Sequence, residues 1–149
     1  MPMIMPDINV LVYAYNTDAP HHAAAKRWWE DVLSGRELVG IPWVVCLGFL
    51  RLMTNRRVCV SPMEPASALA SIRSWLIRPH VQVLEPGPRH MDILDTFAAQ
   101  QLLSSALCTD AHLAALAIEN QAVLWTNDSD FVRFPGLRHR NPLASRSEK

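Results

Sequence analysis

Residues 109–130 read TDAHLAALAIENQAVLWTNDSD, and this stretch gives the strongest indication of the fold class. Its first half is an apolar run with the length and spacing of a buried helix. Residues 122–126 have the β-branched and aromatic character of a short strand, and polar turn residues follow from Asn127 to Asp130. A helix followed by a buried strand and a polar turn is the unit from which parallel sheets are built.

The same alternation of strands and helices runs along the rest of the chain. Short strands are expected at residues 3–7, 37–41, 81–84, 122–126 and 137–140. Helices are expected at residues 10–15, 21–33, 42–53, 65–77, 91–103, 110–120 and, as a short turn, 131–134. We therefore predict an α/β fold of three layers, α/β/α, with a mainly parallel central sheet.

Composition predicts one folded cytoplasmic domain. Half of the 149 residues are hydrophobic and 19% are charged, which is enough apolar material to bury a core. The 14 basic and 14 acidic residues balance, so net charge neither demands nor excludes a nucleic acid partner. Three cysteines without a C-x-x-C pair favour a reducing compartment, and no apolar run is long enough to span a membrane. We place the domain at residues 1–143 and expect the polar residues 144–149 to be disordered.

Aspartates stand where the predicted strands end. Asp7 closes the first strand, Asp128 and Asp130 follow the strand at 122–126, and Asp110 opens the last long helix. The carboxyl ends of parallel strands meet at one edge of a sheet, where ligands bind. Carboxylates gathered there repel one another unless a cation neutralises them or some take up protons. Hard oxygen ligands of this kind favour Mg²⁺, with Mn²⁺ as a substitute, over zinc.

Each carboxylate also has a purely structural interpretation. Asp110 suits the N-cap of the helix that follows it, and Asp128 and Asp130 suit a turn after a strand. Asp7 is harder to explain in this way, because it lies among apolar residues with no cationic neighbour in the sequence. Taken together, the three positions favour the metal interpretation.

Several segments, in matching order, resemble motifs of PIN-domain proteins. The first, third and fourth motifs of that family are matched by MPDINVLVYA at 5–14, TDAHLAALA at 109–117 and TNDSDF at 126–131. FLRLMTN at 49–55 and FPGL at 134–137 resemble segments of the VapC toxins, a group of PIN-domain proteins found in bacterial toxin–antitoxin pairs. No single motif is specific for the family. Their occurrence in matching order along nearly the whole chain is specific for it.

This resemblance implies a small Mg²⁺-dependent endoribonuclease that a cognate VapB-like antitoxin holds inactive. A carboxylate-bound Mg²⁺ would acidify the attacking water and offset the charge that develops on the phosphate. Cleavage by water would leave a 5′-phosphate and a 3′-hydroxyl. The substrate implied is RNA.

The resemblance also implies a role for each site residue. Asp7 and Asp110 are the expected direct metal ligands. Asp128 completes the catalytic set and, together with Asp130, would bind the ion through water or orient the nucleophile. The remaining two expected site residues, which would hold the carboxylates in place, are Asn9 and Thr126.

One position departs from the family pattern. PIN domains commonly carry a fourth acid just before a segment like 49–55, and this chain has Gly48 there. The site is then completed by Asp130, or binds metal more weakly, or belongs to a PIN-like domain that binds RNA or protein without cleaving. We favour the first outcome, because the other aspartates occur together.

Two groups of arginines are candidates for contact with an RNA backbone. The first is Arg51, Arg56 and Arg57, and the second is Arg133, Arg138 and Arg140. Phosphate contacts supply most of the affinity in such complexes. A solvated basic face explains both groups equally well. The apolar helix faces and five tryptophans lead us to expect core packing or a homodimer.

Overall fold

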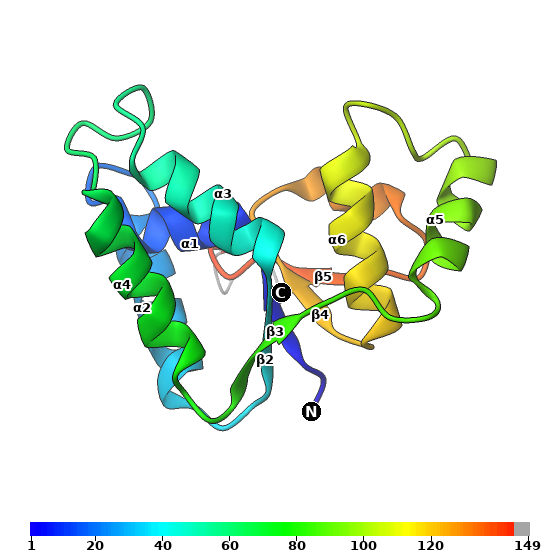
Figure 1. Cartoon of the computed structure of the whole chain (residues 1–149), viewed down its shortest axis with the longest axis horizontal. Helices are drawn as coiled ribbons and strands as arrows, with labels where there is room; N and C mark the ends of the chain where they lie inside the picture. Colours follow the sequence, from blue (N-terminus) through cyan, green and yellow to red (C-terminus); the bar gives the residue numbers. More distant parts are fainter. Residues whose placement is uncertain (145–149) are drawn as a thin grey trace.

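The structure, a computed structural model, describes residues 1–144, so the predicted tail lies almost entirely outside the described residues (Figure 1). The strands are Ile4–Pro6 (β1), Val39–Pro42 (β2), Val81–Leu84 (β3), Val123–Trp125 (β4) and Arg138–Arg140 (β5). The α-helices are Ile8–Tyr15 (α1), His22–Ser34 (α2), Trp43–Met53 (α3), Pro65–Leu76 (α4), His90–Ala99 (α5) and Cys108–Glu119 (α6). A 3₁₀ helix, η1, covers Ser129–Arg133.

The strands form one parallel sheet in the order β3-β2-β1-β4-β5. Ile4 of β1 pairs with Val39 of β2 on one side and with Val123 of β4 on the other. The chain therefore runs to one side of β1 for β2 and β3, and then returns to the other side for β4 and β5. The strand order reverses at β1, and ligands bind beside such a reversal, outside the carboxyl ends of the strands.

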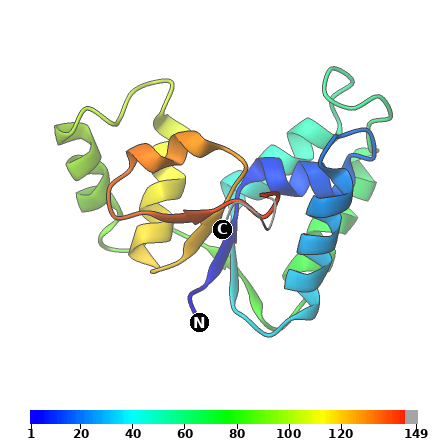
Figure 2. The same ribbon diagram turned by 180° about the vertical axis from the view of Figure 1, so that it is seen from behind.

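The helices cover both faces of the sheet. Helix α1 packs against α2 and α3, α3 packs against α4, and α5 packs against α6 (Figure 1). The view from behind shows the same two groups of helices, α1–α4 and α5–α6, on opposite sides of the strands (Figure 2). This arrangement confirms the predicted three-layer α/β/α fold.

Aromatic side chains from helices α1 to α4 pack together in the core. Trp75 meets Phe49 and Trp29 edge to face, at ring-centroid distances of 4.8 and 5.6 Å. Its indole Nε1 donates a hydrogen bond of 2.8 Å to the hydroxyl oxygen of Tyr15. The three apolar rings are at most 2% exposed, so this cluster removes a large apolar area from water.

Two helices end in the left-handed conformation at a glutamine. Gln101 after α5 has φ 62°, and Gln121 after α6 has φ 53°. In each case the following N–H bonds back over the last turn, from Leu102 to Phe97 O and from Ala122 to Ala117 O, both at 2.8 Å. This is the Schellman arrangement, which usually takes Gly at the left-handed position. The predicted helix end at residue 103 is therefore wrong, because no glycine marks the stop.

Helix α6 begins earlier than predicted, and this changes the place of Asp110. The helix starts at Cys108 with Leu107 as its N-cap, so Asp110 lies within the first turn. The N-cap interpretation of Asp110 is therefore wrong. Pro42 ends β2 and caps α3 instead of being the first helical residue. Within residues 1–144, every helix is too short or too polar to cross a membrane.

Candidate active site

Asp7 is a buried carboxylate at the junction of β1 and α1. Its backbone N–H donates to Trp125 O at 2.9 Å, which continues the pairing of β1 with β4 by one residue. As the N-cap of α1, its Oδ1 accepts a hydrogen bond of 2.7 Å from the N–H of Ile8. Its Oδ2 accepts a second bond of 2.7 Å from the hydroxyl of Thr126. The side chain is only 7% exposed, so both bonds compensate for lost hydration.

The hydroxyl of Thr126 ties the ends of β1 and β4 together. While donating to Asp7, Oγ1 of Thr126 accepts the N–H of Asp128 at 3.0 Å and an amide proton of Asn9 at 3.4 Å. The carbonyl oxygen of the Asn9 side chain accepts the N–H of Asn127 at 3.3 Å. Asn9 and Thr126 therefore lie where a carboxylate-orienting role requires them.

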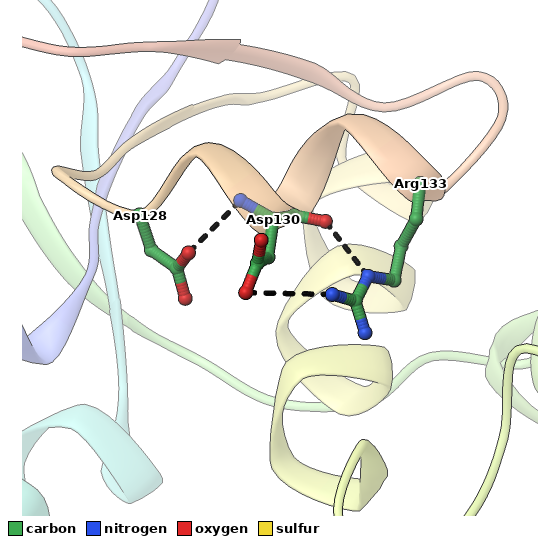
Figure 3. A network of polar contacts seen from close by, with 3 residues as sticks. All are labelled: Asp128, Asp130 and Arg133. Atoms are coloured by element: carbon green, nitrogen blue, oxygen red, sulfur yellow. Dashed lines mark hydrogen bonds and ion pairs between the residues drawn. The ribbon is translucent and has the colours of Figure 1, made fainter.

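The acids of η1 follow directly after β4. Asp128 caps η1, and its Oδ1 accepts the N–H of Asp130 at 2.9 Å. The carboxylate of Asp130 pairs with Arg133 instead, with 3.4 Å between Oδ2 and Nη2. The side chains of Asp128, Asp130 and Arg133 project from the same side of η1 (Figure 3). The turn interpretation of Asp128 is confirmed, because its side chain caps η1.

Electrostatic coupling joins these acids to one another. Burial raises the pKa of Asp7, bonds from Thr126 and Ile8 oppose this rise, and negative Asp110 and Asp128 add to it. Burial also raises the pKa of Asp110, which Asp128 raises further and Arg133 lowers. Carboxylates from the end of β1, the start of α6 and the end of β4 therefore occupy one region of the molecule, close enough to affect each other's ionisation.

The candidate metal donors at this site are carboxylate oxygens. Within residues 1–144, no three His, Cys, Asp or Glu side chains are grouped closely enough to hold a metal ion by themselves. Carboxylates are the protein ligands that Mg²⁺ uses, together with water. Asp7 follows β1, and Asp110 lies in the first turn of α6, where the helix dipole favours negative charge. These are the two side chains that could hold such an ion.

The space beside Gly48 is filled by an apolar side chain. Gly48 is buried in α3, and a Cβ at this position would overlap with Cδ1 of Ile8, the residue after Asp7. An acid at position 48 could therefore be accommodated only if Ile8 moved. The structure thus has an apolar contact where the family commonly has an acid.

The arginines proposed for RNA binding differ in their environments. Arg51 lies in the last turn of α3, and Arg56 and Arg57 follow the helix; all three are exposed. Arg138 donates to Gln121 O at 2.6 Å, and the guanidinium of Arg140 lies 6.0 Å from the ring centre of Trp125. Neither β5 arginine contacts the carboxylate cluster.

Arg133 forms an ion pair with one of these acids, Asp130. The sequence offered a signal for this contact, since Asp130 and Arg133 are three residues apart, the spacing of side-chain pairs on a helical turn. The signal is visible only when residues 129–133 are recognised as helical. The ligand and catalytic assignments of the aspartates remain predictions.

Comparisons with known proteins agree with this architecture. Residues 4–137 match the family described as the PIN domain. Ribonuclease VapC33 of Mycobacterium tuberculosis is 42% identical over 141 residues, which are 95% of this chain and 99% of that protein. Ribonuclease VapC37 of the same organism is 40% identical over 142 residues, again 95% of this chain and 99% of that protein.

Solved structures support the fold at lower identity. VapBC2 from Rickettsia felis, bound to a DNA fragment from its promoter, superposes with a TM-score of 0.66 at 19% identity and covers 93% of this chain and 98% of that chain. VapC20 of M. tuberculosis, described as a Sarcin-Ricin loop cleaving toxin, gives a TM-score of 0.63 at 22% identity, covering 91% of this chain and 98% of that one. From its sequence and its fold, the chain belongs to the VapC group of the PIN-domain family.

Proposed function

We propose that this protein is a divalent-metal-dependent endoribonuclease, the toxin of a toxin–antitoxin pair. Its relatives at 40–42% identity are named ribonucleases and align with almost the whole chain. The observation that supports the proposal most is the electrostatic coupling of Asp7, Asp110 and Asp128, which come from three separate chain segments. Capping explains Asp7 and Asp128 singly, but it does not explain why Asp110 and Asp128 lie close enough to raise the pKa of Asp7.

Asp7 and Asp110 are the proposed direct ligands of the ion. A divalent cation bound there supplies positive charge to the scissile phosphate and makes an attacking water more acidic. Mg²⁺ suits these oxygen donors, and Mn²⁺ is the expected substitute. Because burial and like charge raise the pKa of both acids, the bound ion would also relieve their mutual repulsion.

The remaining polar residues hold this pair in place and serve the water. Asp128 is the proposed acceptor for the proton of the attacking water, since it lies close enough to both Asp7 and Asp110 for its charge to raise their pKa values. The Thr126 hydroxyl fixes the orientation of Asp7 and the backbone of Asp128. Asn9 in turn holds Thr126 and Asn127.

A catalytically impaired PIN-like binding domain is the alternative that Gly48 raised. The apolar contact of Gly48 with Ile8 leaves the site without the family's fourth acid. The coupled aspartates are all retained, and relatives that are 40–42% identical carry the name ribonuclease. This alternative is therefore not favoured.

We also propose a VapB-like antitoxin and a second copy of this chain as partners. Exposed apolar side chains gather on α3 and α4, where Trp43 is 50%, Leu47 58% and Leu69 49% exposed, and Ile77 beside them is 78% exposed. A surface of this kind marks a protein interaction site. Sedimentation of the purified chain, alone and with the antitoxin, tests the assembly. The cytoplasmic location stays a prediction.

The activity itself is tested with purified protein and a structured RNA. We expect cleavage with Mg²⁺, no cleavage with a chelator, and recovery when Mn²⁺ is added. The Asp7→Asn variant should be inactive under all three conditions. Cleavage that persists in the chelator, or equally in the variant, would exclude this site as the source of the activity.

A further inference from the structure

Arg133 is held at the rim of the acidic cluster by two contacts with a single residue. Its Nε donates to the backbone oxygen of Asp130 at 2.9 Å, and its Nη2 lies 3.4 Å from Oδ2 of the same residue. Asp130 is itself fixed, because its N–H donates to Asp128. The three residues thus form one connected unit on η1 (Figure 3).

The guanidinium keeps donors free while it is held in this way. Arginine has five N–H donors in a planar fork. Within residues 1–144, the contacts of Arg133 use Nε and one side of Nη2, and Nη1 makes no hydrogen bond. The side chain is 34% exposed, so these donors can reach a ligand from solvent. A fork of this geometry matches the oxygens of a phosphate.

Charge balance explains why a cation is needed at this position. Asp7, Asp110, Asp128 and Asp130 carry four negative charges when ionised, and one divalent ion neutralises only two of them. A phosphodiester approaching the remaining charge would be repelled. Arg133 is joined to these acids by contact, because it pairs with Asp130, whose N–H donates to Oδ1 of Asp128.

We propose that Arg133 binds a non-bridging oxygen of the RNA phosphate beside the metal, and that Asp130 is a positioning residue for Arg133 and not a metal ligand. This inference rests on the proposed function, and it replaces the ligand role predicted for Asp130 from the sequence. The carboxylate of Asp130 is 66% exposed and directed to Arg133, whereas Asp7 is buried.

The metal arm of the test uses Mn²⁺ alone, measured by electron paramagnetic resonance without RNA. Asp130→Asn should keep the native Mn²⁺ affinity, and Arg133→Gln should keep or slightly tighten it. Asp110→Asn should weaken it by at least about tenfold. Weakening by Asp130→Asn to the level of Asp110→Asn would make Asp130 a ligand and overturn the proposal, whether or not the protein cleaves RNA.

The substrate arm measures binding of a short fluorescent single-stranded RNA with Ca²⁺ in place of Mg²⁺, with a gel confirming that the RNA stays intact. Arg133→Gln should weaken binding about tenfold and reduce the slope of log affinity against log salt by about 0.7. Arg133→Lys should recover part of the affinity, because it keeps the charge without the fork. Asp130→Asn should weaken binding less than Arg133→Gln.

The matched control is Arg27→Gln, which removes an exposed arginine from α2, outside the cluster. It should leave both the affinity and the salt slope unchanged. An Arg133→Gln variant that behaves like this control would show that Arg133 is only a structural part of η1. Absence of RNA binding by the native protein would instead refute the proposed function.

Discussion

The aromatic cluster of α1–α4 and the carboxylate of Asp7 at the acidic edge of the sheet are both buried, but with opposite consequences. In the core, Trp75 packs edge to face against Phe49 and Trp29, so burial stabilises the fold. At the edge, Asp7 is almost as inaccessible, yet its burial and its acidic neighbours disfavour its charged form. The residues that stabilise this protein are thus separate from those that would perform its chemistry.

This difference has a simple physical consequence. Removing a core ring should destabilise the protein and leave the chemistry of the folded molecules intact. Removing an edge carboxylate should abolish the chemistry and leave the fold intact or more stable, because like charges no longer face one another. Each region therefore serves as the control for the other.

The largest effect is expected for Asp110→Asn. We expect RNA cleavage to fall by about 1000-fold or more, equal to about 4 kcal/mol, because a direct contact to the ion is lost. Cleavage time courses with Mg²⁺ measure this, and urea denaturation of the same samples should show an unchanged fold. Asp95→Asn, at an exposed acid of α5, is the control and should cleave normally. Equal cleavage by both variants would break the comparison.

Trp75→Ala should give the largest loss of stability. The change removes a fully buried ring and its hydrogen bond to Tyr15, so we expect the free energy of unfolding to fall by about 3–4 kcal/mol. Urea denaturation followed by circular dichroism measures this. Val60→Ala, at a side chain that is 83% exposed, should change stability by at most about 0.5 kcal/mol. A Trp75→Ala variant that stays as stable as this control would show that the aromatic cluster is not the core of the fold.

Thr126→Val tests the link between the two strand ends. The valine keeps the shape but removes the hydroxyl that donates to Asp7 and accepts from Asp128. We expect cleavage to fall about 10–100-fold, the usual effect of losing a group that orients a metal ligand. Thr126→Ser keeps the hydroxyl and should restore most of the activity. If serine and valine variants lose activity equally, packing and not hydrogen bonding explains the position.

The smallest effect concerns the pH dependence of stability without metal. The pKa of Asp7 in the folded state is raised above its ordinary value of 3.8, so between those two values the folded protein binds more protons than the unfolded chain. Stability should therefore rise as pH falls through the raised pKa and level off below the ordinary value. Asp7→Asn should remove this contribution and stabilise the metal-free protein at neutral pH by about 1 kcal/mol. Urea midpoints across this pH range measure it; a loss of stability in the variant would contradict the sign.

The sequence is informative wherever a local pattern also reflects the global fold. Alternating strands and helices predicted the parallel sheet, which the structure confirms. Aspartates after strands predicted carboxylates at one edge of the sheet, because parallel strands end there, and the roles of these aspartates remain predictions. The helix end at Ala99 was not predictable, since Gln101 adopts a conformation usually given to glycine. The pairing of Asp130 with Arg133 was missed because the helical turn was predicted to begin at residue 131, whereas η1 begins at Ser129 and includes both residues.

The most direct test is to locate the ion itself. Crystals soaked in Mn²⁺ and measured at the manganese absorption edge should show one anomalous peak within bonding distance of the carboxylate oxygens of Asp7 and Asp110. Asp128 should then contact that ion or a water attached to it. A peak elsewhere on the molecule, or none between Asp7 and Asp110 at saturating Mn²⁺, would contradict the account.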